Sequence, residues 1–248
     1  MVSKSQIKLI KSLSQKKFRT EHQLFVVEGK KSIEEFLKSG YETSFFFTSE
    51  EGLFEAEGAV LIAETELAKI TMLKNPQKVL AVFKIPKPAS PNFNGLIVAL
   101  DGVRDPGNLG TIIRLCDWFG VEQIMASDDT VDCYNPKVVQ ASMGSLGRIK
   151  IQYLDLEKIF KVLPVDYPVF GAFLEGENVY KSILPERAVI VMGNEAHGIR
   201  ENITQFINSP VTIPQFGKNQ QTESLNVAMA TAVFLSEFRR TGFTGKQN

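Results

Sequence analysis

The sequence predicts a two-domain α/β protein whose second domain is built on a largely parallel sheet. The chain has 248 residues, 44% hydrophobic and 23% charged, which is enough for one large domain or two modest ones. Short apolar segments alternate with helical stretches along most of its length. A stretch with three prolines and no apolar periodicity, PKPASPNFNG, separates the two parts and is typical of a linker.

The first domain is predicted to span residues 1–85, followed by a linker at 86–93. Four short apolar segments in it are typical of strands: LFVVEG, TSFFFTS, AVLIA and KVLAVFKI. Between the first two, KKSIEEFLKSG has helical periodicity and ends at Gly40, a residue that commonly follows a helix. These elements predict a small α/β unit.

The second domain is predicted to span residues 94–248. Six compact apolar strands are expected in it, in this order: GLIVAL, QIMAS, RIKIQYL, PVFGAF, AVIVMG and PVTIP. Most are separated by helical stretches, and unbroken apolar strands are typical of a parallel sheet covered on both faces. We find neither an internal repeat nor a low-complexity tract.

Composition excludes several classes of protein. The two cysteines, Cys116 and Cys133, and the two histidines, His22 and His197, are too few and too scattered for a disulfide framework or a zinc site. The longest apolar runs are about five residues, far short of a membrane span, and no apolar segment follows the basic start of the chain. We therefore expect a cytoplasmic protein without metal.

Charge is balanced overall but uneven along the chain. The net charge is zero, which argues against indiscriminate coating of nucleic acid. Residues 1–20 nevertheless carry six basic side chains and no acidic one, whereas residues 41–70 carry seven glutamates. The basic segment is either a solvated helix or a phosphate-binding arm, and Lys17-Phe18-Arg19 favours RNA.

Three of the predicted strands end in loops rich in Gly, Asn and Glu: DGVRDPGNLG, GNEAHG and QFGKNQQTESLN. In an open α/β sheet ligands bind at the carboxyl ends of strands, so the three loops predict one composite site. The chain contains no GxGxxG, no GxxxxGK[ST] and no GxSxG. These absences argue against a dinucleotide site, a P-loop and a serine hydrolase.

The helix after the first loop carries Arg114. Thr111, Arg114 and Asp117 form its polar side, and Ile112, Ile113, Leu115 and Trp118 are expected to supply apolar surface. Either Arg114 pairs with Asp117 one turn away, or its planar guanidinium reaches back to bind a phosphate through two parallel hydrogen bonds.

The other two loops leave similar alternatives. Glu195 and Asn194 are interpreted either as site residues or as N-terminal caps of a helix, and His197 as part of the loop. Ser224 and Asn226 precede a helix that is apolar nearly all round over residues 225–238, so either residue also suits an N-cap. A helix of this kind is buried in the core or in a subunit contact, and we expect a homodimer.

Together the loops resemble the SpoU (TrmH-like) branch of the SPOUT family, RNA ribose 2′-O-methyltransferases that use S-adenosylmethionine. The family's three motifs correspond to NLGTIIR (108–114), GNEAHG (193–198) and Ile213-Pro214 with ESLNVA (223–228). They occur in order at predicted strand ends, which makes chance agreement improbable. The sequence departs from the family at Gln215, where Met is frequent, and in a longer, more polar QFGKNQQT loop.

This resemblance also extends to the first domain. KKFR, LFVVEGKKSIEEFLKSG and NPQKVLAVF are similar to the family's L30e-like RNA-binding domain. The resemblance implies that residues 94–248 form a SPOUT α/β domain with a deep C-terminal trefoil knot, an exception to the rule that chains avoid threading loops.

The resemblance also implies the site residues. Met192, Gly193, Ile213 and Leu225 would hold S-adenosylmethionine, and the residues lining the ribose side would be Asn108, Arg114, Glu195, Ser224 and Asn226. Methyl transfer to a hydroxyl requires alignment and a route for the proton but no metal. Because a guanidinium stays protonated, Arg114 is a poor base. We expect it to clamp the phosphate beside the target ribose, with the proton leaving through that phosphate, water or Glu195.

Ribosomal RNA is the expected substrate, because an L30e-like module suits folded RNA recognised by shape and unpaired bases. Three alternatives stay open at this point: a transfer RNA ribose methyltransferase, a SPOUT enzyme that methylates a base, and an RNA-binding protein without catalysis. The GNE and SLN signatures favour ribose.

Overall fold

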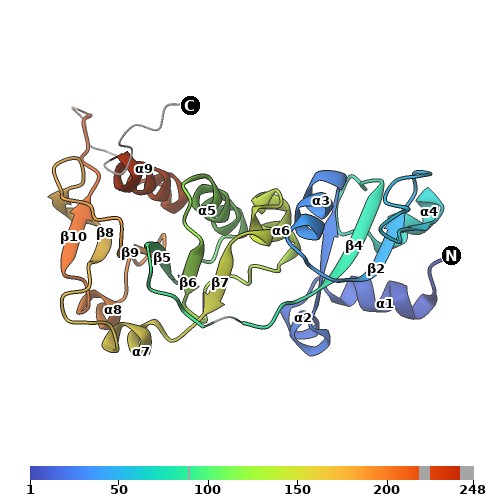
Figure 1. Cartoon of the computed structure of the whole chain (residues 1–248), viewed down its shortest axis with the longest axis horizontal. Helices are drawn as coiled ribbons and strands as arrows, with labels where there is room; N and C mark the ends of the chain where they lie inside the picture. Colours follow the sequence, from blue (N-terminus) through green and yellow to red (C-terminus); the bar gives the residue numbers. More distant parts are fainter. Residues whose placement is uncertain (89, 218–223, 241–248) are drawn as a thin grey trace. The chain divides into compact units, whose positions relative to one another are not determined.

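The computed structural model describes residues 1–88, 90–217 and 224–240. The chain forms two compact units (Figure 1): Met1–Pro88 with Asp132–Arg148, and Ala89–Val131 with Ile149–Asn248. Residues 132–148 therefore belong to the first unit although they lie far beyond the linker. The division into domains 1–85 and 94–248 stays a prediction.

The first unit is an α/β unit with a four-stranded sheet in the order β1-β4-β2-β3. Strand β4 is antiparallel to β1 and β2, and β2 is parallel to the short β3. Its elements are α1 (Lys4–Ser12), α2 (Lys16–His22), β1 (Leu24–Glu28), α3 (Lys30–Lys38), β2 (Thr43–Thr48), β3 (Val60–Leu61), α4 (Glu64–Ile70), β4 (Val79–Lys84), α6 (Pro136–Ser142) and the 3₁₀ turn η1 (Ser145–Gly147). All four predicted strands are confirmed.

Aromatic rings from both parts of the chain form the core of the first unit. Phe25 packs against Phe36 and Phe83 at ring-centre distances of 5.4 and 5.9 Å. Tyr134, from the segment 132–148, lies 4.6 Å from Phe25. Burial of such rings is the main stabilising contribution of a small core, so this segment completes the core of the first unit.

Arg19 anchors the same segment. Its guanidinium donates to Asp132 Oδ2 from Nε at 2.8 Å and to the carbonyl oxygens of Leu13 and Ser14 at 2.8 and 3.0 Å. Only 3% of the side chain is exposed. Within the Lys17-Phe18-Arg19 run, Arg19 is therefore used inside the first unit, and the exposed Lys17 is the cation left for RNA.

The second unit is a six-stranded sheet in the order β10-β8-β9-β5-β6-β7, and every described pairing in it is parallel. This confirms the predicted parallel sheet and its six strands. Its elements are β5 (Leu96–Asp101), α5 (Pro106–Trp118), β6 (Gln123–Ala126), β7 (Lys150–Tyr153), α7 (Leu156–Lys161), β8 (Val169–Asn178), β9 (Ala188–Gly193), α8 (Glu201–Thr204), β10 (Ser209–Thr212) and α9 (Val227–Arg240).

Both faces of this sheet are covered, α5 and α9 lying together on one side and α7 and α8 on the other (Figure 1). As a result, the side chains of β5 are buried on both faces of the sheet. Ile97 and Ala99 belong to the core cluster that includes Leu156 and Ile203 from the side of α7 and α8, yet every residue of β5 is buried. Two-sided burial explains why the central strands are apolar without alternation. The trefoil knot stays a prediction.

Candidate functional site

The first two motif loops lie side by side because β5 and β9 are neighbours at the centre of the sheet. Their parallel register pairs Leu100 with Met192 and Asp101 with Gly193, so both strands end at the same level. From β5 the chain continues to β6 and β7 on one side, whereas β9, β8 and β10 lie on the other. Ligands collect at such a reversal of strand order.

The loop after β5 places Asn108 at this edge. Asp105 is the N-cap of α5, and its carboxylate accepts a hydrogen bond from the backbone N–H of Asn108 at 2.8 Å. Pro106 occupies the first helical position, where its fixed φ suits the start of a helix. The cap therefore holds Asn108 in the first turn, with its side chain half-buried at the loop.

The loop after β9 folds into a tight turn, which we call the 194–198 hairpin. The backbones of Asn194 and Gly198 exchange two hydrogen bonds of 2.9 Å, and Asn194 Oδ1 accepts from the N–H groups of Ala196 and His197. Asn194 Nδ2 donates to the carbonyl oxygen of Gly102 at 2.6 Å. The helix-cap interpretation of Asn194 and Glu195 is thus wrong, since the next helix, α8, begins only at Glu201.

Gly193 is needed where the hairpin closes. A Cβ atom built on it would lie 2.3 Å from the carbonyl carbon of Gly198 and 2.5 Å from the backbone nitrogen of Ile199. These atoms are backbone and cannot rotate away, so any side chain at position 193 displaces the hairpin. The glycine of the GNE motif is therefore explained by close backbone approach.

The third motif meets the first two through Asn226. Its Oδ1 accepts from the N–H groups of Ala228 and Met229 at 2.9 and 3.3 Å, so Asn226 is the residue that caps α9. Its Nδ2 donates to Asn108 Oδ1 at 2.9 Å, and Asn108 Nδ2 donates to Glu195 Oε1 at 2.8 Å. Residues from three loops form one hydrogen-bonded chain, which we call the Asn226–Asn108–Glu195 relay.

The direction of this relay follows from the cap. Because the N–H groups of α9 occupy Asn226 Oδ1, only its amino group is left to face Asn108. Asn108 must then turn its oxygen toward Asn226 and its amino group toward Glu195. A carboxylate, which only accepts when ionised, is the residue that completes such a chain. The helix cap thereby sets the orientation of all three side chains.

Two predicted ribose-side residues are not part of the relay. Arg114 is exposed on α5 and, in the part of the chain that the structure describes, forms no ion pair or side-chain hydrogen bond. The alternative of an Arg114–Asp117 pair is therefore not seen. Ser224 is exposed, and its hydroxyl has no hydrogen bond to a described residue. Their roles stay predictions.

The sequence predicts that Trp118 supplies apolar surface for packing, but in the structure its side chain is exposed. It is 85% exposed, whereas Ile112, Ile113 and Cys116 are buried. Trp118 lies four residues after Arg114, so both project from the same outer face of α5. An exposed tryptophan beside an arginine that has no partner among the described residues marks this face as distinct from the core side of the helix.

Of the four residues assigned to the cofactor, Met192 and Gly193 end β9, Ile213 follows β10, and Leu225 precedes α9. Met192 is buried, Gly193 and Ile213 are half-buried, and Leu225 is 52% exposed. Ile213 and Leu225 thus leave apolar surface uncovered beside loops with accessible backbone groups. Apolar walls with a few backbone donors and acceptors suit an adenine ring, so the residues present fit S-adenosylmethionine. Individual contacts stay predictions.

The described residues offer little support for a metal site or a cysteine nucleophile. Among residues 1–88, 90–217 and 224–240 no group of three or more His, Cys, Asp or Glu side chains could hold a metal ion. Both cysteines are buried and unbridged, and burial raises the pKa of the Cys116 thiol, which disfavours the nucleophilic thiolate. No described helix has the length and apolarity of a membrane span.

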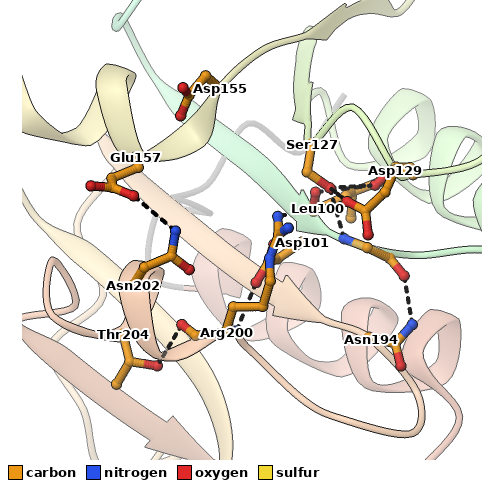
Figure 2. A network of polar contacts seen from close by, with 12 residues as sticks. Leu100, Asp101, Ser127, Asp129, Asp155, Glu157, Asn194, Arg200, Asn202 and Thr204 are labelled. Atoms are coloured by element: carbon orange, nitrogen blue, oxygen red, sulfur yellow. Dashed lines mark hydrogen bonds and ion pairs between the residues drawn. The ribbon is translucent and has the colours of Figure 1, made fainter.

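Sequence reasoning did not identify the polar network beside the relay (Figure 2). Asp101, the last residue of β5, binds Arg200, and Asp129 accepts from Ser127 Oγ at 2.8 Å. Although burial, the largest single effect, opposes it, the hydrogen bonds from Ser127 and Arg104 lower the pKa of Asp129. A signal was available at Asp101, a charged residue ending a fully apolar strand.

The network borders a cavity of about 290 Å³ at the carboxyl ends of β6 and β7, lined in part by Asp129, Asp155, Glu157, Arg200 and Asn202. Its carboxylates make it acidic. The cavity is separate from the relay residues, none of which lines it, and an acidic wall is unsuited to a phosphate chain.

Comparison with known proteins gives a consistent result. The SpoU rRNA Methylase family matches residues 95–236, and the MRM3-like substrate binding domain matches residues 4–81. The 23S rRNA (guanosine(2553)-2′-O)-methyltransferase RlmP of Bacillus subtilis is 28% identical over 236 residues, covering 92% of this chain and 94% of that protein.

Two solved structures are similar over almost the whole chain. A putative RNA methyltransferase of the TrmH family from Porphyromonas gingivalis has a TM-score of 0.90 and 38% identity, with 97% of this chain and 99% of that chain covered. An AdoMet-bound rRNA methyltransferase from Sinorhizobium meliloti has a TM-score of 0.83 and 31% identity, with 97% of each chain covered.

Proposed function

The chain belongs to the SpoU rRNA methylase family, and we propose that it transfers a methyl group from S-adenosylmethionine to a ribose 2′-hydroxyl of ribosomal RNA. The observation that carries this proposal is the Asn226–Asn108–Glu195 relay. It joins the three loops that the family resemblance identified, and it does so at the reversal of strand order where an α/β sheet binds ligands.

Glu195 is the proposed proton acceptor. One of its carboxylate oxygens accepts from Asn108, which leaves the other oxygen for the ribose hydroxyl. In the reaction the hydroxyl oxygen forms a bond to the methyl carbon, the bond from that carbon to sulfur breaks, and the hydroxyl proton passes to Glu195. The relay holds the carboxylate still, so that alignment is in place before the reaction.

Bound S-adenosylmethionine supplies a methyl group made electrophilic by its positively charged sulfur. Met192, Gly193, Ile213 and Leu225 are the residues proposed to hold it, with backbone groups of Gly193 and Leu225 and the apolar surface of Ile213 and Leu225. Ser224 stands two residues before Asn226 and is proposed to contact the ribose. Excluding water from these loops strengthens each polar contact made there.

Arg114 is proposed to bind the phosphate next to the target ribose. Its guanidinium is exposed and has no ionic partner among the described residues, and it shares a face of α5 with Trp118. Helix α9, which packs against α5, also exposes Met229. Exposed apolar side chains on two packed helices indicate an interface. We propose a homodimer through this face, which would place Arg114 at the subunit boundary.

Ribosomal RNA is favoured over transfer RNA as the substrate. Residues 4–81 match the MRM3-like substrate binding domain, and Lys4, Lys8, Lys16 and Lys17 are exposed on α1 and α2. Cationic side chains of this kind contact the RNA backbone and bind more weakly as salt rises. We propose that the enzyme acts in the cytoplasm.

The test is transfer of a labelled methyl group into unmodified ribosomal RNA and transfer RNA in separate reactions, with Arg114→Ala as the control. Label in ribosomal RNA, in nucleotides resistant to alkaline cleavage and absent with Arg114→Ala, is the expected result. Label in transfer RNA alone overturns the substrate class, and label on a base overturns the ribose assignment. No label, together with no binding of S-adenosylmethionine, indicates a non-catalytic RNA-binding protein.

The dimer has its own test. Sedimentation should give a dimer for the wild type and a shift toward monomer for Trp118→Lys, because a charge replaces the exposed ring. If Arg114 serves the partner's site, mixing Arg114→Ala with Glu195→Gln restores about a quarter of wild-type activity to the mixture as a whole, since about half of the dimers are mixed and each mixed dimer has one intact site of two. A monomeric wild type contradicts the proposal.

A further inference from the structure

Asp101 ties the end of β5 to Arg200, which lies two residues after the 194–198 hairpin. Its side chain has no exposed surface. Oδ2 accepts from the backbone N–H of Arg200 at 2.8 Å, and Oδ1 accepts from Arg200 Nε at 2.7 Å. The Nη2 of Arg200 also contacts Oδ1. A fully buried carboxylate is costly to desolvate, and this one is satisfied almost entirely by a single residue.

Gly102, the next residue, is held from two further directions. Its N–H donates to Ser127 Oγ at 2.9 Å, and its carbonyl oxygen accepts from Asn194 Nδ2 at 2.6 Å. Arg200 and Asn194 thus reach the end of β5 from the two ends of the hairpin (Figure 2). The backbone N–H and the carbonyl oxygen of Gly102 are therefore both hydrogen-bonded.

These contacts constrain the two residues of the relay that come from neighbouring loops. Glu195 lies inside the hairpin, between the anchors at Asn194 and Arg200. Asn108 lies six residues after Gly102, beyond a loop that is fixed at Gly102 and at the Asp105 cap. The separation between Glu195 and Asn108 is therefore set by how the hairpin is fastened to the end of β5. A misplacement of about 1 Å in such a site costs about 100-fold in rate.

We propose that Arg200, through Asp101, is a positioning residue for the methyl transfer: the Asp101–Arg200 pair holds Glu195 at hydrogen-bonding distance from Asn108. This inference rests on the proposed function and adds a residue outside the three motifs. The pair does not touch the relay directly. The guanidinium borders the 290 Å³ cavity and is 48% exposed, so in its absence water can enter the space and solvate the Asp101 carboxylate.

The experiment compares three variants with the wild type in the methyl-transfer assay on ribosomal RNA. Arg200→Gln removes the charge, and Arg200→Lys keeps it without the forked geometry. Arg187→Gln is the matched control, because Arg187 is also a partly exposed arginine of the second unit, where it donates to the carbonyl oxygen of Phe93 and stacks on Tyr167. Unfolding in urea is measured for all four proteins.

The expected result is a separation of kcat from KM. Arg200→Gln lowers kcat by about 10- to 100-fold, because the site is misaligned, and leaves KM for ribosomal RNA within about twofold, because the RNA surface is unchanged. Arg200→Lys recovers part of the loss, since an ammonium replaces the charge but not the fork. Arg187→Gln keeps wild-type kcat.

Two outcomes overturn the proposal: wild-type kcat in Arg200→Gln, or an equal loss of kcat in Arg187→Gln, which would assign the effect to general destabilisation. Failure of the proposed function gives a different result, because the wild type itself would then methylate no ribosomal RNA. In that event crystal structures of the wild type and Arg200→Gln decide the matter. An unmoved Glu195 in the variant overturns the positioning role, and a displaced Glu195 supports it.

Discussion

Each unit contains an arginine–aspartate pair in which one side chain is fully or nearly buried. The buried side chain is the arginine in the first unit and the aspartate in the second. In the first unit the guanidinium of Arg19 is 3% exposed, and its partner Asp132 lies nearer the surface. In the second unit Asp101 has no exposed surface and the guanidinium of Arg200 is 48% exposed. Both arginines use Nε to bind the carboxylate, at 2.8 and 2.7 Å.

The difference lies in what each pair fastens. Arg19 also donates to two carbonyl oxygens at the end of α1, so it joins α1, α2 and the segment 132–148 into one core. Asp101 lies at the end of a strand and fastens a hairpin that carries Glu195. A buried cation deep in a unit serves its stability, whereas a buried anion at the sheet edge fixes the geometry of a site.

The largest effect is expected for Asp132→Asn. The substitution keeps the shape and the Oδ1 acceptor for the Tyr134 N–H but leaves the buried guanidinium without a counter-charge. Loss of one partner of a buried pair costs about 3 kcal/mol or more of unfolding free energy. Urea unfolding measures this loss, and kcat at saturating RNA should stay unchanged. A loss below about 1 kcal/mol would mean that this pair contributes no more than an exposed ion pair. The contrast between the two arginine–aspartate pairs would then not hold.

Glycine substitutions sharpen the same contrast. Gly193→Ala drives a methyl group into the backbone of Gly198 and Ile199, so we expect kcat to fall about 100-fold through displacement of the hairpin. In the first unit, Gly144→Ala meets the Cβ and Cγ of Glu35 at 2.8 Å with φ at +90°. That change should cost about 1–3 kcal/mol of stability and leave kcat unchanged. Equal losses of kcat in both variants would contradict the assignment.

The smallest effect concerns a partly buried carboxylate at the end of β1. Burial raises the pKa of Glu28 in the first unit, against the lowering effect of hydrogen bonds from Thr71 and the Met72 N–H. Because the folded-state pKa is the higher one, stability falls as pH rises from the ordinary carboxyl value through that raised pKa. Glu28→Gln keeps an acceptor for the Met72 N–H and can donate to the Thr71 hydroxyl instead of accepting from it, so it should lack this fall. Unfolding curves between pH 4 and pH 8 that are parallel for both proteins would refute this.

The sequence predicted the second sheet well because its strands are apolar and short. LIVALD and AVIVMG pair in the register that brings two motif loops together, and two-sided burial requires that pattern. Asn108, Glu195 and Asn226 are assigned to the ribose side only through family resemblance. Their hydrogen bonds span 87 and 118 residues of chain, a distance over which periodicity carries no information.

Other features could not be predicted for related reasons. Asp132 looks like an ordinary loop residue, and only the fold shows that the segment 132–148 completes the first unit. Trp118 was expected to pack because it is apolar, yet its position four residues from Arg114 puts it on the outer face. The direction of the relay depends on which atom of Asn226 caps α9, which no sequence pattern encodes.

The central claim, that the cap of α9 orients the relay which holds Glu195, is tested most directly by Asn226→Asp. Asp caps a helix as well as Asn does, but it cannot donate to Asn108. Asn108 would then turn its amino group toward position 226 and its oxygen toward Glu195, acceptor against acceptor. Asn135→Asp is the matched control, because Asn135 caps α6 through the Lys137 N–H at 2.9 Å.

The measurement is kcat for methyl transfer to ribosomal RNA together with the free energy of unfolding. We predict that Asn226→Asp lowers kcat by at least about tenfold, as loss of one oriented contact in a site commonly does. Its stability should stay within about 0.5 kcal/mol of the wild type, and Asn135→Asp should change neither quantity. A wild-type kcat in Asn226→Asp would contradict the account.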